Sequence, residues 1–476
     1  MWQALWPGVP PEEVPIEHVT NGVHLPSWIS PEMQELYERH LGPRWREEPA
    51  DETVWRLAER IPADELWRTR DRRRERLVAF ARRRLRAQAV RRNEPPSNVE
   101  AAGEALDPKV LTIAFARRFA SYKRPSLLFH DPDRLAALMS SATRPMQIIV
   151  AGKAHPQDEA GKLLIQQISA LGRDARFRGR LIFLEDYDIE VARSLVQGAD
   201  LWLNTPLRPN EASGTSGMKA AANGSLNLST LDGWWAEAWE RADRQREPVG
   251  WVIAAEEADL APEVRDALEA DALYHLLERE VVPGFYERGP DGIPRRWIGW
   301  LRSSVTQLCP FVNGHRMVRE YAERYYLPAL QSYRKLVADG ATGARGRARL
   351  EAAWSGLAIE SVEAEPVNTL RVSTPIRVRA LVRLGVLAPE EVRVELYLGR
   401  VNPRGEVEDA AAVQLRPVGR ADADRFTFEA EALTCRRSGA HGYTVRVRAN
   451  HDGQVATFVP GLLTWAASDT TGGPGG

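Results

Sequence analysis

Between residues 109 and 240, apolar runs of strand length alternate with segments of helical spacing. Strands that are apolar throughout are typical of a parallel sheet whose two faces are covered by crossover helices. We therefore predict an α/β fold with a doubly wound parallel sheet, in which ligands bind beyond the carboxyl ends of the strands. The predicted strands are VLTIAF (110–115), MQIIVAG (146–152), RLIFLED (180–186), ADLWLNTP (199–206) and SLNLSTLDG (225–233).

The loops after these strands carry the polar residues that a binding site needs. Arg117, Arg118 and Lys123 follow the first strand, and Tyr187 and Asp188 follow the third. No G-x-G-x-x-G follows any strand, so a dinucleotide site is not supported. C-x-x-C and H-E-x-x-H spacings are also missing from the sequence, and we expect no metal site.

The segment NEASGTSGMKAAANG (210–224) is the most informative of these loops. Its small and hydroxyl residues precede a short helix predicted around 218–222, so exposed N–H groups and the helix dipole would form a cradle for an anion. In a doubly wound sheet, the basic loop 116–125 faces the same crevice. Two such loops at one crevice indicate a ligand with more than one negative group, and phosphates fit best. The alternative for this loop alone is an ordinary tight turn with a surface lysine.

Lysine usage draws attention to Lys219, which lies about one turn into that short helix. Of the 64 basic residues only six are lysine, so 58 are arginine. A lysine kept in a Gly/Ser/Thr loop of such a chain indicates a need for a primary amine, because amines form Schiff bases and guanidinium groups do not.

The charge balance excludes several classes of protein. The 64 Lys and Arg residues meet 65 Asp and Glu residues, which argues against a nucleic-acid binder. No apolar run approaches a membrane span, and the first 20 residues do not read as a signal peptide. The two cysteines, Cys309 and Cys435, exclude a disulfide framework. We expect a cytoplasmic protein with no nucleic-acid or membrane partner.

The flanking regions predict helices and then an antiparallel sheet. Residues 55–92 have helical spacing, and their arginine cluster is interpreted as a solvated helix face; NEPPSN then ends this helix. Residues 250–345 are predicted to be mostly helical. From about residue 356, apolar and polar residues alternate with period two, which predicts an antiparallel β-sandwich.

Several segments, taken in order, resemble one family. VTNGVHLPSW, ARRFASYKRP, AGKAHP, EASGTSGMK and LNLSTLDGWW are together similar to the carboxyl-terminal half of the α-glucan (glycogen/maltodextrin) phosphorylases, in their shorter bacterial and archaeal branch. The resemblance is clear over residues 16–240. It implies that the sheet is the carboxyl-terminal lobe of a two-lobed GT-B glycosyltransferase, and that the sandwich is an extra domain of that branch.

The sequence pattern and this resemblance together imply a division of the chain. We expect an interlobe link and helical segment at 1–108, a Rossmann-like lobe with returning helices that binds cofactor and phosphate at 109–345, the sandwich at 350–466 and a disordered tail at 467–476. Because the sequence begins near the interlobe link, we expect it to lack the amino-terminal lobe. That lobe could be separately encoded, or the chain could form a homo-oligomer.

The family's functional residues carry over position by position. Its cofactor is pyridoxal 5'-phosphate, held as a Schiff base by a lysine that Lys219 matches. Thr215, Ser216 and Gly217 match the cradle of the cofactor phosphate, with Lys123 close to that phosphate and Tyr187 lining the site. Arg118 matches the arginine that binds the substrate phosphate. The residues that match groups binding the glucan's sugar units are Asn21, Glu211, Ser213 and Gly214. Arg118, Lys123 and Thr215 are thereby the catalytic candidates.

Three positions depart from the family pattern. Ser216–Gly217 replaces the common Gly-Asn, which could alter backbone contacts in the cradle. Arg117 replaces a lysine and keeps its charge. Asp188 replaces the arginine of the longer enzymes, which could weaken a phosphate contact or mark the shorter branch.

The implied reaction is phosphorolysis of the terminal α-1,4 bond of a glucan by inorganic phosphate, with retention, to give α-glucose 1-phosphate. A nucleotide-sugar-dependent glucosyltransferase of the same architecture is one alternative. Such enzymes often carry E-x7-E, and here the two positions are Glu211 and Lys219, so an amine replaces a donor-binding glutamate. A truncated fragment that binds cofactor or glucan without turnover is the other alternative.

Overall fold

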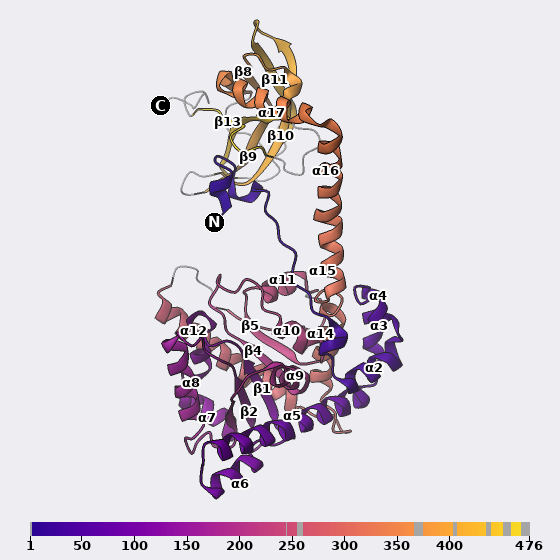
Figure 1. Cartoon of the computed structure of the whole chain (residues 1–476), viewed down its shortest axis with the longest axis vertical. Coiled ribbons are helices and arrows are strands. Elements are labelled where there is room, and N and C mark those ends of the chain that lie inside the picture. Colours follow the sequence, from indigo (N-terminus) through magenta and orange to yellow (C-terminus); the bar gives the residue numbers. More distant parts are fainter. Residues whose placement is uncertain are drawn as a thin grey trace. The chain divides into compact units, whose positions relative to one another are not determined.

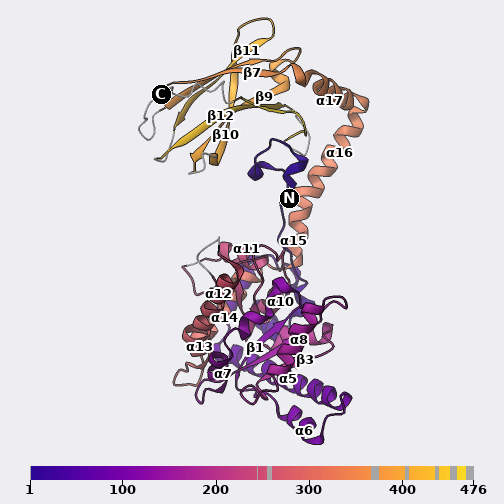
Figure 2. The same ribbon diagram turned by 90° about the vertical axis from the view of Figure 1, so that its left-hand side faces the viewer.

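The computed structural model of the 476-residue chain describes residues 2–243, 245–254, 260–365, 375–402, 407–434, 439–450 and 458–467. Two compact units make up the chain (Figures 1 and 2). One unit is Val19–Tyr321. The other joins the residues before Val19 to those from Ala322 onward.

A six-stranded parallel sheet forms the centre of the Val19–Tyr321 unit. Its strand order is β3-β2-β1-β4-β5-β6. The five predicted strands are confirmed, and β6 is an addition in a region predicted to be helical. The strands are β1 Leu111–Ala116, β2 Met146–Ala151, β3 Leu181–Leu184, β4 Leu201–Asn204, β5 Leu226–Thr230 and β6 Gly250–Ile253.

Helices cover both faces of this sheet, as the apolar runs predict. Ala114 and Ala116 of β1 belong to a core that α5, α9 and α10 complete on one face. Ile113 and Phe115 belong to a core on the opposite face, completed by α7, α8, α12, α13 and α14. The helices of the two faces are α5 Ala63–Arg91, α9 Ile189–Gly198 and α10 Ser216–Ala222, and α7 Pro132–Ser140, α8 Glu159–Leu171, α12 Pro262–Leu276, α13 Val282–Tyr286 and α14 Arg295–Leu308.

Short helices before the sheet form a further core rich in aromatic residues. Tyr37, Trp45 and Trp55 are fully buried and meet edge to face, with the Tyr37 and Trp55 ring centroids 5.4 Å apart. This core also includes residues of α10, α11 and α14, so it packs the start of the unit against the helix that carries Lys219. The remaining helices of the unit are α1 Leu25–Trp28, α2 Pro31–Leu41, α3 Arg44–Glu47, α4 Glu52–Trp55, α6 Pro96–Glu104, α11 Trp234–Arg241 and α15 Gly314–Tyr321.

The prediction of one helix over residues 55–92 is wrong at its beginning. The chain forms α4 and then a 3-10 turn at Arg56–Arg60, and α5 begins only after Pro62. Proline has no N–H and disfavours helical geometry in the preceding residue, and Ile61 is accordingly extended, with φ −60° and ψ 128°. The predicted break at NEPPSN is confirmed, because α5 ends at Arg91.

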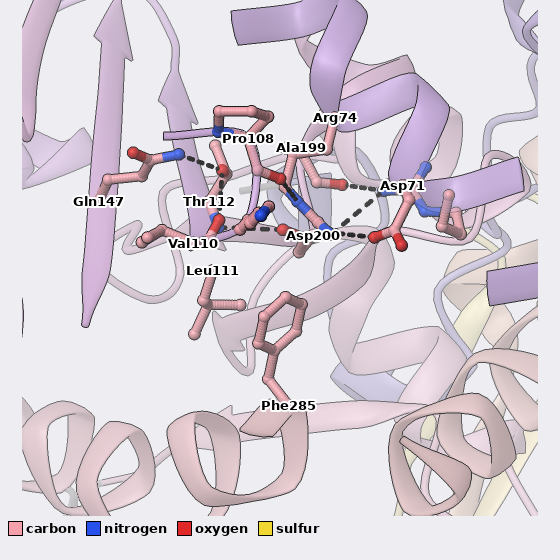
Figure 3. A network of polar contacts seen from close by, with 12 residues as sticks. Asp71, Arg74, Pro108, Val110, Leu111, Thr112, Gln147, Ala199, Asp200 and Phe285 are labelled. Carbon is pink, nitrogen blue, oxygen red and sulfur yellow. Dashed lines mark hydrogen bonds and ion pairs between the residues drawn. The ribbon is translucent and has the colours of Figure 1, made fainter. Parts of the chain in front are cut away.

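The arginine cluster of α5 is not simply a solvated face, because Arg70, Arg73 and Arg74 are buried. Arg74 forms ion pairs with Asp200 (Nη1–Oδ1, 2.8 Å) and with Asp71, and its Nε donates to the Pro108 carbonyl at 2.6 Å (Figure 3). Arg70 donates to the carbonyl oxygens of residues 197, 199 and 223. Burial lowers the pKa of Arg70 to about 10. These arginines therefore tie α5 to the segments around α9, β4 and α10.

The other unit is built on a seven-stranded antiparallel sheet in the order β13-β12-β9-β10-β11-β8-β7. The long strand β10 pairs with β9 through its first half and with β11 through its second, and its register shifts on both sides. The sheet thus curls over one core, and β7 lies near β12. The predicted antiparallel strands are confirmed, as one curled sheet made of β7 Ala358–Glu365, β8 Pro375–Arg383, β9 Val392–Val401, β10 Val407–Arg420, β11 Arg425–Thr434, β12 His441–Ala449 and β13 Leu463–Trp465.

Residues from both chain ends join this second unit. The helices α16 Leu327–Asp339 and α17 Ala341–Ala353 precede the sheet. Near the start of the chain, the Gly8 carbonyl accepts a 2.7 Å hydrogen bond from Trp465 Nε1, and Glu13 pairs with the buried Arg446. Cys435 and residues 468–476 of the predicted tail lie outside the described residues. The other cysteine, Cys309, is buried, and burial raises the pKa of its thiol. None of the described helices combines the length and apolar character that crossing a bilayer requires.

We expect Asp200→Asn to destabilise the Val19–Tyr321 unit by about 3–5 kcal/mol, because it removes the buried carboxylate that faces both Arg70 and Arg74 and leaves Arg74 paired with Asp71 alone. Urea unfolding followed by tryptophan fluorescence measures the change. Asp174→Asn is the control, since Asp174 pairs with Arg176 at the surface and should leave the transition in place. Equal transitions for Asp200→Asn and the wild type would contradict a structural role for this pair.

Candidate active site

Two loops at the carboxyl edge of the sheet meet at one carboxylate. Arg117 directly follows β1, and Lys123 ends a short 3-10 turn six residues later. Arg117 Nη2 and Lys123 Nζ both pair with Oε2 of Glu211, which lies in the loop after β4. All three side chains are buried. The predicted meeting of the loops 116–125 and 210–219 is therefore confirmed.

Glu211 is held in its charged form. Burial acts to raise its pKa, but the charges and hydrogen bonds of Arg117 and Lys123 outweigh burial, so the pKa lies below its usual value. Both contacts use Oε2, and Oε1 remains available as an acceptor. Because one carboxylate faces two cations, the trio carries one positive charge in excess.

Asp232 supports the Glu211 loop from the end of β5. Its Oδ2 accepts a 2.8 Å hydrogen bond from the Glu211 N–H, and its Oδ1 accepts one of 3.0 Å from the Gly233 N–H. Burial raises the pKa of Asp232. The sequence analysis did not assign Asp232, although it lies within the quoted segment LNLSTLDGWW, where an aspartate that follows a strand end is a signal for such a role.

One hydrogen-bond donor of Arg117 is unsatisfied among the described residues. Its Nη1 is buried and has no hydrogen-bond partner among the described residues. Gly214 has φ +69°, and a Cβ there would lie 3.6 Å from Arg117 Nη2, so the backbone passes close to the guanidinium. Burial raises the pKa of Tyr187, and the charge of Arg117 acts against that shift. A buried donor without a partner is an unsatisfied hydrogen-bonding group, and an anion or a water molecule is the usual kind of partner for such a group.

Lys219 extends from α10 toward an aromatic ring. Its Nζ lies 3.7 Å from the ring centroid of Trp28, at the end of α1. Burial lowers the pKa of Lys219, and no carboxylate among the described residues pairs with it. The N-cap residue Thr215 makes no side-chain capping bond, so the first N–H groups of α10 are not satisfied by that side chain. A larger neutral fraction favours this amine as a nucleophile.

Asn223 joins the two backbone segments that carry the amine and the ring. Its Nδ2 donates to the carbonyl of Lys219 at 2.8 Å and to that of Trp28 at 2.9 Å. Its Oδ1 accepts from the Ser30 N–H at 2.8 Å, and its own carbonyl accepts from Arg70 at 2.8 Å. The residue is fully buried. Sequence reasoning gave no role to Asn223 or Trp28, because their contacts join segments almost 200 positions apart.

The other predicted residues occupy different settings. Arg118 is exposed, and no described residue forms an ion pair or hydrogen bond with it. Asn21 is also exposed, and its backbone carbonyl accepts from Arg316 Nη2 at 3.1 Å. No hydrogen bond or ion pair in the described part of the chain links either residue to Glu211 or Lys219. The structure thus brings Arg117, Lys123 and Glu211 together, whereas Arg118 and Asn21 are exposed and lie outside this cluster of contacts.

The cradle residues make contacts that depend on their small size. A Cβ at Gly217 would lie 2.5 Å from Asn227 Oδ1, so only glycine fits beside β5 at this position. Ser216 Oγ accepts from Trp202 Nε1 at 3.2 Å, and the Ser213 carbonyl accepts from the Trp234 N–H at 2.9 Å. The departure from Gly-Asn to Ser216–Gly217 is therefore accommodated by packing against Asn227 and Trp202.

Comparisons with known proteins agree on one family. A family model described as "Carbohydrate phosphorylase" matches residues 9–249, and one described as "Glycogen phosphorylase C-terminal domain" matches residues 354–467. A glycogen phosphorylase of Mycobacterium tuberculosis is 40% identical over 98% of this chain and 53% of its own length. A maltodextrin phosphorylase of Thermococcus litoralis is 36% identical over 98% of the chain and 54% of its own length. A glycogen phosphorylase of Aquifex aeolicus is 42% identical over 70% of the chain and 46% of its own length. The chain thus spans about half the length of the curated relatives it matches.

We expect Lys219 to become reactive at a lower pH than an ordinary lysine, because its pKa lies below the usual value of 10.5. With a lowered pKa, a larger fraction of the amine is neutral at any given pH than in an ordinary lysine. Pulse acetylation at a series of pH values, with mass spectrometry of the lysine peptides, gives the pH at which the reactivity of each lysine side chain is half maximal. The same peptide labelled in urea is the control, since unfolding removes the burial. Identical folded and unfolded midpoints for Lys219 would refute the burial effect.

Proposed function

This chain belongs to the carbohydrate phosphorylase family, and on that premise we propose that it acts in the phosphorolysis of terminal α-1,4-glucosidic bonds. Inorganic phosphate attacks the terminal linkage of a glucan with retention, and the products are α-glucose 1-phosphate and a shortened glucan. The observation that carries the proposal is the half-buried amine of Lys219, which has no ionic partner among the described residues and lies on the helix after the Glu211 loop. We also infer that the parallel sheet is the carboxyl-terminal lobe of a GT-B architecture, with the cofactor- and phosphate-binding region at 109–345.

The residues present fit pyridoxal 5'-phosphate. Lys219 offers an unpaired amine for its aldehyde, and the uncapped start of α10 at Thr215, Ser216 and Gly217 offers N–H groups for its phosphate. Lys123 and the free Nη1 of Arg117 add positive charge. Tyr187 would line the cofactor's side of the site. When bound, the cofactor supplies a phosphate group that takes part in proton transfer with the substrate phosphate.

This chain's own residues would hold two phosphates close to each other. Two such groups repel, and the positive charge left over from Arg117, Lys123 and Glu211 offsets part of that repulsion. Arg118, which is exposed and unpaired among the described residues, is free to bind the incoming phosphate through its planar fork. The positive charge of these loops thus favours a dianionic ligand such as phosphate.

The glucosyl unit would be bound by groups around the same carboxylate. Glu211 keeps Oε1 as an acceptor for a sugar hydroxyl, because Arg117 and Lys123 occupy only Oε2. Ser213 and Gly214 contribute polar groups of the same loop, and Asn21 an exposed amide. A carboxylate that is kept charged is the stronger hydrogen-bond acceptor, so its two cations improve its hold on the sugar.

The family match supports phosphorolysis over transfer from a nucleotide sugar. A nucleotide-sugar enzyme with E-x7-E would need a glutamate at position 219, and this chain has a lysine there. Binding of cofactor or glucan without turnover is the remaining alternative, and separate measurements of cofactor capture and product release distinguish it.

We expect Lys219 to capture pyridoxal 5'-phosphate. Treating the full chain with the cofactor and then with borohydride should fix one pyridoxyl group to the Lys219 peptide, identified by mass spectrometry. Lys219→Arg should abolish this labelling, because a guanidinium cannot condense with the aldehyde. Lys335→Arg is the matched control and should label like the wild type. Labelling spread over the six lysines would reject the proposed site.

We expect release of glucose 1-phosphate from a maltodextrin only when phosphate and cofactor are both supplied. Glu211→Gln should lower kcat/KM about 10- to 100-fold, the effect of about 1.5–3 kcal/mol lost from hydrogen bonds to a charged group. Glu159→Gln, on the exposed face of α8, is the control and should keep wild-type kcat/KM. Cofactor capture without release would favour the binding-only alternative.

A further inference from the structure

Arg124 has a backbone conformation that is unusual for an arginine. It directly follows Lys123, and its φ of 43° and ψ of 55° lie in the left-handed region. Glycine, and less often asparagine or aspartate, is the residue that usually occupies this region, because a larger side chain is strained there. An arginine in a strained conformation persists when contacts of its side chain over-determine the backbone. The proposed reaction gives no role to this residue.

The guanidinium group of Arg124 is buried, and each of its nitrogen atoms has a partner. The residue is 5% exposed. Its Nε donates to the Thr205 carbonyl at 3.1 Å, and its Nη2 donates to the Pro206 carbonyl at 3.0 Å. On the side of α12, Nη1 pairs with Asp266 Oδ1 at 2.7 Å and Nη2 pairs with Glu269. The planar fork therefore joins the loop after β1 to the segment after β4 and to α12.

The segment after β4 returns hydrogen bonds to the loop of Lys123. Thr205 Oγ1 donates to the carbonyl oxygens of Lys123 and Arg124, at 3.0 Å each. On the other side of Lys123, the Tyr122 carbonyl accepts from the Leu207 N–H at 2.7 Å. The backbone is thus tied to the segment after β4 on both sides of the lysine.

The same two loops meet again at the candidate active site, where Lys123 Nζ pairs with Glu211. A lysine carries a point charge on a flexible four-carbon stem, so its ion pair alone does not fix how the loops approach. The guanidinium of Arg124 is a rigid fork whose hydrogen bonds require one orientation. The contacts of Arg124 therefore set the backbone position from which the amine reaches the carboxylate.

We propose that Arg124 is a positioning residue that holds the amine of Lys123 against Glu211. It acts through the backbone of its own loop and touches neither substrate nor cofactor. The inference rests on the proposed function only where it concerns phosphate. There, an amine that Arg124 already holds in place meets the cofactor phosphate without first having to be ordered.

The reactivity of Lys123 in the free chain tests this positioning without cofactor or substrate. Wild-type Lys123 should be acetylated slowly, because it is buried and ion-paired. Arg124→Gln should raise its rate of acetylation at least about fivefold relative to the exposed Lys109 of the same sample. Arg134→Gln is the matched control and should leave the rate unchanged. Arg134 also pairs with carboxylates of α12 and of the turn after it, but no described ion pair or hydrogen bond joins it to the loop of Lys123.

A double variant separates loss of positioning from loss of folding. Arg124→Gln leaves the buried Glu269 without its cation, which lowers stability. Combining it with Glu269→Gln removes both charges, and urea unfolding should then give a transition closer to that of the wild type. Lys123 should be equally reactive in the single and double variants, whereas Lys219, whose backbone Asn223 holds, should keep its wild-type rate. Wild-type protection of Lys123 in both variants, or an equal rise at Lys219, would overturn the proposal.

Two forms of the cofactor test the link to phosphate. Pyridoxal 5'-phosphate and pyridoxal share the aldehyde, but only the former carries a phosphate group. In absorbance titrations of the full chain, Arg124→Gln should reduce the preference for pyridoxal 5'-phosphate over pyridoxal about tenfold, with the affinity for pyridoxal unchanged. An unchanged preference would overturn the role of Arg124 toward phosphate. If neither compound binds at Lys219 in the wild type, the proposed function fails, while the acetylation rates still decide the positioning role.

Discussion

The carboxylate of Glu211 is the contact on which the arrangement of the site depends. Two cations, Arg117 and Lys123, are buried at the carboxyl edge of the sheet, and two like charges cannot share such a place without a counter-charge. Glu211 supplies that charge from a loop about 90 positions away. It therefore fixes how the loops after β1 and β4 approach, and it leaves the excess positive charge that a phosphate ligand requires.

A second set of contacts fixes the backbone of the helix that carries the Lys219 amine. Arg70, on the long helix α5, donates to the Asn223 carbonyl at the end of α10, and Asn223 in turn holds the carbonyls of Lys219 and Trp28. These bonds are made by backbone groups and fully buried side chains, so they tolerate little displacement. The arginine-rich helix thus has a structural role inside the unit, and its buried members act through hydrogen bonds that a lysine could not make in the same number.

The sheet was predictable because strands buried on both faces are apolar at nearly every position, and the topological rule then placed the loops of Arg117 and Glu211 together. The four-residue strand β6 was missed, since its short apolar run does not by itself distinguish a strand from a buried helix segment. The burial of Arg70 and Arg74 was missed because their partners are carbonyls and an aspartate from distant segments. The same reason hides Trp28 beneath Lys219, since no local pattern reports a contact across 191 positions.

Two physical effects act in opposite directions on the charge of the Lys219 amine. The face of Trp28 attracts a cation, whereas burial disfavours the charged form and lowers the pKa of Lys219. An exposed lysine would be protonated at neutral pH, and a lysine beside a carboxylate would be held in that state. Burial, together with the lack of a carboxylate partner among the described residues, leaves the amine less strongly charged. This setting suits the role proposed for Lys219, in which the amine condenses with an aldehyde and then serves as an anchor.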